Sequence, residues 1–143
     1  MTRATDLSEA ILARLAAISV ANGFHTDIQS VYGFGERKPD RALPPYLLVR
    51  IDADEAIKRS CNTAQRMATY SIEGVLSRAA GLQDLQRLHH DILRSLGMGQ
   101  MPIVSRQRAE WLAEESVEFD PDQNGSTART LICTLQIHYL EEY

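Results

Sequence analysis

The sequence predicts an α+β domain in which two helices pack on one face of a mostly antiparallel sheet of about five strands. Two segments, 5–22 and 82–96, place apolar residues at three- and four-residue steps, which is typical of amphipathic helices. Other segments alternate apolar and polar residues, which is typical of strands. The predicted order is helix, three strands, helix, two strands. The length favours a single domain over residues 1–143.

The composition argues against several classes of protein. Hydrophobic residues make up 44% of the chain and charged residues 24%, as in ordinary folded proteins. The net charge of −4 is opposite in sign to the basic surplus of general phosphate-backbone binders. No segment approaches the roughly 18 consecutive apolar residues of a membrane span, and the first residues do not form an apolar signal segment. We therefore expect no membrane partner, and a protein made in the cytoplasm.

The first predicted element is the helix over 5–22. Thr5 or Asp6 can cap its N-terminus, and Glu9 stands three positions after Asp6 in the spacing of a capping box. Gly23 follows the last apolar turn, where a left-handed residue commonly ends a helix. The boundaries of this helix therefore follow from local signals.

Three strands are predicted between the helices. Residues 26–32 alternate, and residues 46–51 are almost continuously apolar, which favours an interior strand covered on both faces. Residues 67–77 alternate again. The polar segment 52–65 between these strands fits either a long loop or a short helix, and the sequence does not decide between them.

The second half of the chain is predicted as a helix over 82–96, bounded by glycines, followed by two strands. The segment 102–119 alternates imperfectly, which indicates a bend or bulge near 113–115. The cluster of turn residues over 120–126 predicts an antiparallel hairpin with the strand over 129–140. That last strand has an apolar face formed by Leu131, Cys133, Leu135, Ile137 and Tyr139.

The pair Gly33 and Gly35 is the nearest match to a phosphate-binding loop. A dinucleotide fingerprint needs a third glycine three residues later and a helix that opens there. Here Lys38 holds that position and a strand follows instead of a helix. We therefore interpret this segment as a turn.

The histidines do not have the spacing of a metal site. His89, His90 and Asp91 are consecutive on the predicted second helix, where adjacent residues point about 100° apart, and the i, i+4 pair of a helical metal site is absent. His25 and His138 are distant in sequence. We expect surface or boundary histidines and no metal.

No motif of nucleophilic catalysis is present. The sequence contains no GxSxG or SxxK motif, and neither Cys61 nor Cys133 has a local signature of a catalytic thiol. Both cysteines are expected to be reduced. The acidic residues from Asp52 to Glu55 are followed by basic ones, which favours a solvated loop. The sequence therefore predicts no catalytic residue, no cofactor and no enzyme.

An ordered set of segments carries a family resemblance over the whole chain. These segments are "ILARLAAISVANGF", "HTDIQSVYGFGE", "LPPYLLVRID", "ATYSIEGVL", "LQDLQRLHHDILRSL" and "DQNGSTARTLICTLQIHYLEEY". In this order the chain resembles the tail terminator, or tail completion, proteins of long-tailed bacteriophages and prophages. The motifs are structural rather than catalytic, and their order and spacing carry the resemblance. The segment 52–65 has no counterpart in it.

The resemblance implies a virion protein of the tail and neck. Such a subunit forms a homo-oligomeric ring, usually a hexamer, that ends polymerisation of the tail tube and offers a joining surface to the head. Its implied partners are copies of itself, the major tail tube protein and the head connector, and DNA passes through the lumen without specific binding. Two alternatives stay open: another neck or head-completion protein, and a small α+β enzyme or ligand-binding domain.

The polar segments 33–45 and 52–65 are the candidate contact regions, because both are long for so small a domain. The basic run after Phe34 is interrupted by Asp40 and has no further aromatic for stacking, which disfavours readout of nucleic acid. For this run an idle solvated loop is favoured over a partner contact. The predicted contact residues are Phe34, Arg37, Lys38, Arg41, Asp54, Lys58 and Arg59.

Overall fold

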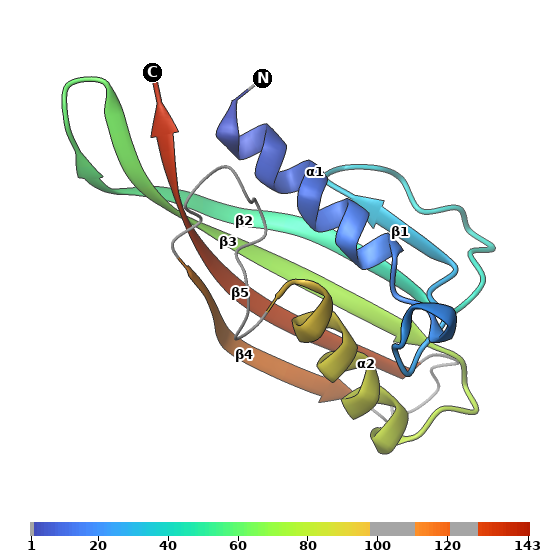
Figure 1. Ribbon diagram of the computed structural model, residues 1–143. Helices are drawn as coiled ribbons and strands as arrows, with labels where there is room; N and C mark the ends of the chain where they lie inside the picture. The colour runs from blue at the N-terminus through green and yellow to red at the C-terminus, as the bar shows by residue number, and fades with distance from the viewer. Residues whose placement is uncertain (1, 98–110, 121–128) are drawn as a thin grey trace.

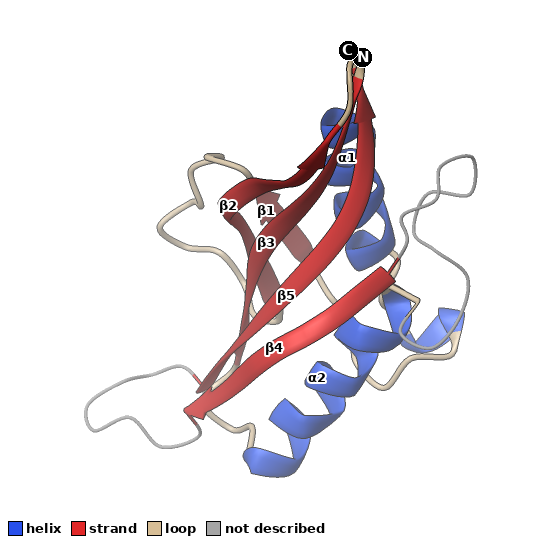
Figure 2. Cartoon of the chain, turned by 90° about the vertical axis from the view of Figure 1, so that its left-hand side faces the viewer, coloured by secondary structure: helices blue, strands red, loops and turns tan. Residues whose placement is uncertain are grey.

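The computed structural model describes residues 2–97, 111–120 and 129–143 and confirms the predicted α+β fold (Figure 1). The elements are the helices α1 (Arg3–Ala16) and α2 (Leu82–Ser95), the 3₁₀ turn η1 (Val20–Asn22), and the strands β1 (Ser30–Gly33), β2 (Tyr46–Arg59), β3 (Thr63–Leu76), β4 (Trp111–Asp120) and β5 (Arg129–Glu142). The five strands form one sheet in the order β1-β2-β3-β5-β4. Neighbouring strands are antiparallel except β1 and β2, which are parallel. Both helices cover the same face of the sheet (Figure 2).

The predicted first helix is in fact two elements, α1 and η1. Thr2 caps α1, because its Oγ1 accepts a hydrogen bond from the Thr5 N–H at 3.1 Å, so the prediction of Thr5 or Asp6 as the cap is wrong. Gly23 has φ 88°, as expected, but it ends η1 and not α1. The apolar periodicity continues beyond the end of α1, because Ile18 lies after the helix but is also buried in the core. The periodicity alone therefore does not show where α1 ends.

The open question over 52–65 has a simple answer, because this segment is neither loop nor helix. It completes β2 as far as Arg59, turns over 60–62 and begins β3 at Thr63. Its backbone N–H and C=O groups take part in the antiparallel pairing of β2 with β3. The register of this pairing shifts between Ile51 and Ala53 and between Ala56 and Lys58. Its side chains are polar because most of them are exposed. Polarity here indicates exposure and not irregular structure.

The prediction that residues 46–51 lie between two covering layers is wrong. Leu47 and Val49 are buried under the helices, but Ile51 is 42% exposed. On the other face Tyr46 is covered by Tyr32, whose ring centroid is 6.0 Å away and nearly perpendicular. The apolar run therefore reflects local cover by an aromatic side chain in place of a second layer of helices.

The core lies between the helices and the sheet. Leu7, Ile11 and Leu15 of α1 and Leu85, Leu88 and Ile92 of α2 are buried. They pack in one cluster with inward side chains of β3 and β5, among them Tyr70, Ile72, Leu131, Cys133, Leu135 and Ile137. The predicted apolar face of β5 is therefore confirmed.

The loop after β1 is a turn, as predicted. The Glu36 N–H donates to the Gly33 carbonyl at 3.0 Å, and Phe34 and Gly35 have φ 48° and 92°. The next element is β2, so this turn does not open a helix. Gly35 supplies the left-handed backbone, and Gly33 leaves room for Leu12, with which a Cβ at this position would clash.

The predictions after α2 are tested in part. Gly97 has φ 83°, as expected for a residue that ends a helix. β4 has the predicted irregularity, between Glu114 and Ser116. The predicted start of that strand over 102–110, and the turn residues 121–126, lie outside the described residues. Neither of the described helices is long and apolar enough to cross a membrane.

Candidate functional site

The predicted contact residues are divided between the two ends of β2. The connection before this strand carries Phe34, Arg37, Lys38 and Arg41, and its far end carries Lys58 and Arg59. β2 has 14 residues, and at about 3.3 Å per residue its ends are roughly 40 Å apart. These side chains therefore form two separate surfaces and not one site.

The connection between β1 and β2 exposes its two arginines. Phe34 is half-buried against the chain's own core, with its ring edge-to-face to Tyr70 at 6.0 Å. The Lys38 ammonium lies 5.4 Å from the centre of the Tyr46 ring. Arg37 and Arg41 are exposed. Within this loop they are the cations most open to a neighbouring molecule.

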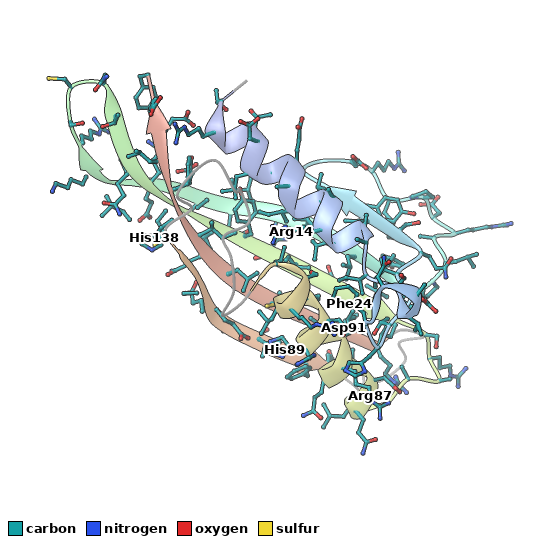
Figure 3. The ribbon with its side chains drawn as sticks, in the orientation of Figure 1. Arg14, Phe24, Arg87, His89, Asp91 and His138 are labelled. Atoms are coloured by element: carbon teal, nitrogen blue, oxygen red, sulfur yellow. The ribbon has the colours of Figure 1, made fainter. Side chains whose placement is uncertain are left out.

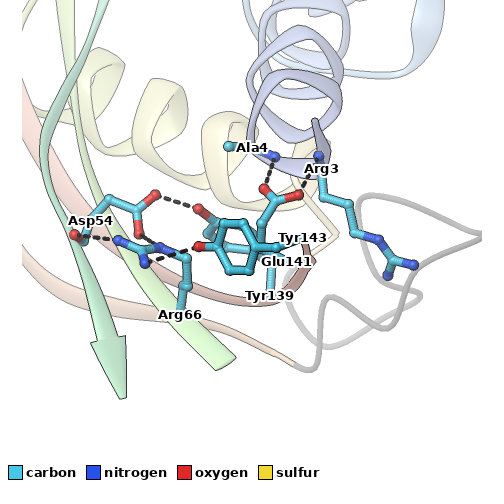
Figure 4. Close-up of polar contacts among 7 residues, drawn as sticks. All are labelled: Arg3, Ala4, Asp54, Arg66, Tyr139, Glu141 and Tyr143. Carbon is cyan, nitrogen blue, oxygen red and sulfur yellow. Dashed lines mark hydrogen bonds and ion pairs between the residues drawn. The ribbon is translucent and has the colours of Figure 1, made fainter. Parts of the chain in front are cut away.

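Asp54 lies inside a polar network, so the prediction of a solvated acidic loop is wrong for this residue. The Arg66 Nε–H donates to its Oδ1 at 2.7 Å, and the Tyr139 hydroxyl donates to its Oδ2 (Figure 4). The hydrogen bond to Asp54 raises the pKa of Arg66. Burial, followed by the hydrogen bond to Asp54, raises the pKa of Tyr139. Asp54 therefore joins β2 to β3 and β5 within the chain.

Asp52 is also tied to its own sheet. The Ser71 hydroxyl donates to one carboxylate oxygen, and the Arg50 Nε–H donates to the other at 2.8 Å. The hydrogen bond from Ser71 is the largest cause that lowers the pKa of Asp52. Glu55, Lys58 and Arg59, by contrast, are exposed toward the end of the hairpin formed by β2 and β3.

A second polar contact docks α1 on the end of the sheet. The buried Glu141 of β5 accepts hydrogen bonds from the Arg3 and Ala4 N–H groups, both at 3.1 Å (Figure 4). A helix leaves its first four N–H groups without intrahelical partners. Glu141 satisfies two of them, and the Thr2 side chain satisfies a third, that of Thr5. The two chain termini therefore lie together at one end of the molecule (Figures 1 and 2).

His89 joins α2 to the edge strand β4. Its Nε2 lies 2.7 Å from Glu114 Oε1, and its ring packs edge-on against Phe119 at 5.7 Å. Cys133 lies beside this pair and is fully buried. Burial, with a contribution from Glu114, raises the pKa of Cys133 to about 12. The thiol therefore stays protonated and packs as a small apolar group, as the sequence predicted.

The other histidine cluster forms where the chain leaves η1 and crosses α2. Asp91 is fully buried, and one of its carboxylate oxygens accepts the His25 N–H at 2.9 Å. The rings of His25 and His90 are exposed, with centroids 5.7 Å apart. Figure 3 shows Asp91 close to Phe24, the residue before His25. Sequence spacing did not reveal this cluster because His25 comes from another element.

The two edges of the sheet differ in charge. The edge strand β4 carries Glu114, Glu115, Glu118 and Asp120, of which Glu115 and Glu118 are exposed. The opposite edge carries β1, and the loop beside it exposes Arg37 and Arg41 together with Glu36 and Asp40. With the half-buried Lys38 the net charge of this loop is +1, so an acidic edge and an edge of mixed, slightly positive charge lie on opposite sides of the same subunit.

A hollow of about 410 Å³ lies between residues 25–27, the end of β3 and the start of α2. Its ionisable side chains are those of His25, Asp27, Asp84 and Arg87, and Arg87 is paired with Asp84 at 3.4 Å. None of the predicted contact residues lines it. It is one of several hollows in the described part of the chain in which a small ligand would fit.

Comparison with protein-family models gives no match, and comparison with curated proteins gives none either. Geometry and the ordered sequence motifs therefore carry the functional argument. Of these, the different charges at the two sheet edges bear most directly on self-association.

Proposed function

We propose that this protein is a structural subunit that joins copies of itself side by side into a closed ring, usually of six copies. The ring caps the tail tube of a long-tailed phage or prophage, ends tube polymerisation and offers a surface to the head connector. The ordered motifs along the chain support this assignment. The protein acts by contact, without a catalytic cofactor and without making or breaking covalent bonds.

The observation that carries the proposal is the difference in charge between the two sheet edges. A ring is built from heterologous contacts, in which one surface of a subunit meets a different surface of the next. The exposed Glu115 and Glu118 on the β4 side and the exposed Arg37 and Arg41 on the β1 side provide two such surfaces. Ion pairs between these arginines and glutamates favour this pairing, and the acidic side chains of two β4 edges would repel each other.

The helix-free face and the β2–β3 hairpin supply surfaces for the partners along the tube axis. The hairpin ends in the exposed Lys58 and Arg59, and the helix-free face exposes Ile132 to 37%. Extended hairpins and uncovered sheet faces are surfaces on which other chains commonly dock. The net charge of −4 is compatible with a lumen through which DNA slides without specific binding.

Reversing the charge of the acidic edge is expected to dissociate the ring. In Glu115→Lys/Glu118→Lys, like charges face each other across every contact, which costs several kcal/mol and weakens each contact at least tenfold. Light scattering coupled to size exclusion is expected to show a ring for the natural chain and monomers for this variant. Adding Arg37→Glu and Arg41→Glu to the variant is expected to restore the ring.

The matched control is Glu9→Lys/Gln83→Lys/Gln86→Lys, which makes the same change of +4 in net charge at exposed positions on the two helices, away from both edges. This control is expected to keep the ring. Unchanged assembly of the edge variant, or equal loss in the control, would contradict the assignment of the two edges.

A further inference from the structure

The carboxylate of Asp91 is only partly satisfied by the residues around it. The side chain is fully buried on α2, and one oxygen accepts the His25 N–H at 2.9 Å. The other oxygen, Oδ1, is buried and has no hydrogen-bond partner among the described residues. Buried carboxylates in native proteins are paired, hydrogen-bonded or bound to a metal. The free oxygen of Asp91 therefore indicates a missing partner.

Two imidazoles lie beside this carboxylate. The rings of His25 and His90 are 5.7 Å apart between centroids, and one ligand atom from each histidine and one from Asp91 lie within 4.8 Å of one another. Metal bonds to nitrogen and oxygen of about 2.0–2.2 Å place the ligands of one ion about 3–4 Å apart. The ligand atoms therefore have to move closer by up to about 1–2 Å. Rotation of the two exposed imidazoles brings their nitrogens toward the buried carboxylate, which stays fixed.

The segment that carries His25 is held against α2 by contacts on both sides of Phe24. Arg94 donates from Nη1 to the Gly23 carbonyl at 2.8 Å, and its guanidinium lies 5.0 Å from the centre of the Phe24 ring. The His25 N–H is bound to Asp91. His25 is therefore positioned over α2 without any ion, which lowers the conformational cost of forming a site.

We propose that His25, His90 and Asp91 bind a divalent transition-metal ion. Two imidazole nitrogens and one carboxylate oxygen suit zinc, cobalt or nickel better than magnesium or calcium, which prefer oxygen ligands throughout. Water fills the remaining positions. The ion gives Asp91 Oδ1 a partner and fastens the chain after η1 to α2. A second, open hollow over the two imidazoles is lined by His25, Gln83, Gln86, Arg87 and His90, and its arginine, Arg87, is already paired with Asp84.

The cluster of His89, Glu114 and Cys133 is the weaker candidate. His89 Nε2 and Glu114 Oε1 already occupy each other at 2.7 Å, so an ion has to displace that contact. Burial raises the pKa of Cys133 to about 12, which disfavours the thiolate that a metal needs. The two clusters share no residue, so a variant in one tests it against the other.

The test is a zinc titration by calorimetry, with cobalt absorption as a second readout, on the full chain without a histidine tag. The natural protein is expected to bind one ion per chain. His25→Ala and His90→Ala are each expected to weaken binding at least tenfold. Both residues are exposed, so circular dichroism should show an intact fold. His89→Ala on the same helix is the control and is expected to bind as the natural chain does.

Three results would overturn the site. The first is absence of zinc binding to the natural chain. The second is binding that survives both His25→Ala and His90→Ala. The third is loss of binding in His89→Ala alone, which would move the ion to the cluster around Cys133. A preference for magnesium over zinc would contradict the proposed class of metal. None of these results depends on whether the protein forms a ring.

Discussion

Gly74→Ala is expected to lower the free energy of unfolding by about 1–3 kcal/mol, because the added methyl group overpacks the core. A Cβ at this position lies 2.7 Å from Leu88 Cδ2 and 3.4 Å from atoms of Leu47 and Leu131. Leu88 is fully buried, so its methyl group has no free space to enter. The glycine thus lets α2 approach β3 closely. Urea denaturation at one fixed protein concentration measures the loss.

The partner residue tests whether this contact is the cause. Leu88→Ala alone leaves a cavity and is expected to cost about 2–5 kcal/mol. The double variant is expected to lose less stability than the sum of the two single losses, because the methyl group added at position 74 fills part of the cavity left by Leu88→Ala. Gly81→Ser is the control, since a Cβ there meets nothing within 4 Å and serine is a favoured N-cap residue. Additive losses in the double variant would show that the two residues do not press on each other.

Glu141→Ala is expected to destabilise the protein by about 1.5–3 kcal/mol, the range for losing hydrogen bonds to a charged group. The carboxylate is buried and holds the N–H groups of Arg3 and Ala4 at the positive end of the α1 dipole. Its removal leaves those two donors without a partner. Thermal and urea unfolding measure the change, and hydrogen exchange at Arg3 and Ala4 locates it.

Glu142→Ala is the matched control for this prediction. Glu142 is the next residue, and its side chain is 60% exposed and paired with Arg3 on the surface at 2.9 Å. Exposed pairs contribute about 0–1 kcal/mol, so little change is expected. Equal losses for Glu141→Ala and Glu142→Ala would mean that α1 does not depend on a buried anchor in β5.

Regular patterns allowed most of the fold to be predicted from sequence. The alternation of β5 and the apolar stripe of α2 each report burial on one face, and both elements lie close to where they were predicted. The segment 52–65 could not be assigned although most of its pairing is that of a local hairpin, with Arg59 opposite Ala64. Only its last residues have a distant partner as well, since Thr63 is opposite Glu142. Exposure of that part of the sheet removed the apolar alternation that identifies a strand.

The polar clusters are harder to predict, because their members are distant in sequence. The sequence predicts a solvated Asp54, since its partners, Arg66 and Tyr139, come from two other strands. The neighbouring pair His90 and Asp91 lacks the spacing of a helical metal site, and His25 joins it only through the packing of the chain after η1 on α2. Sequence spacing reveals clusters within one element, whereas these clusters form between elements.

Native mass spectrometry of the tag-free chain, alone and with preformed tail tubes, tests the proposed function most directly. The expected result is a closed ring whose mass is a multiple of the 16.0 kDa subunit, most often six. That ring is also expected to bind tube ends and to stop further addition of tube protein. A chain that stays monomeric at every concentration and leaves tube growth unchanged would contradict the proposal.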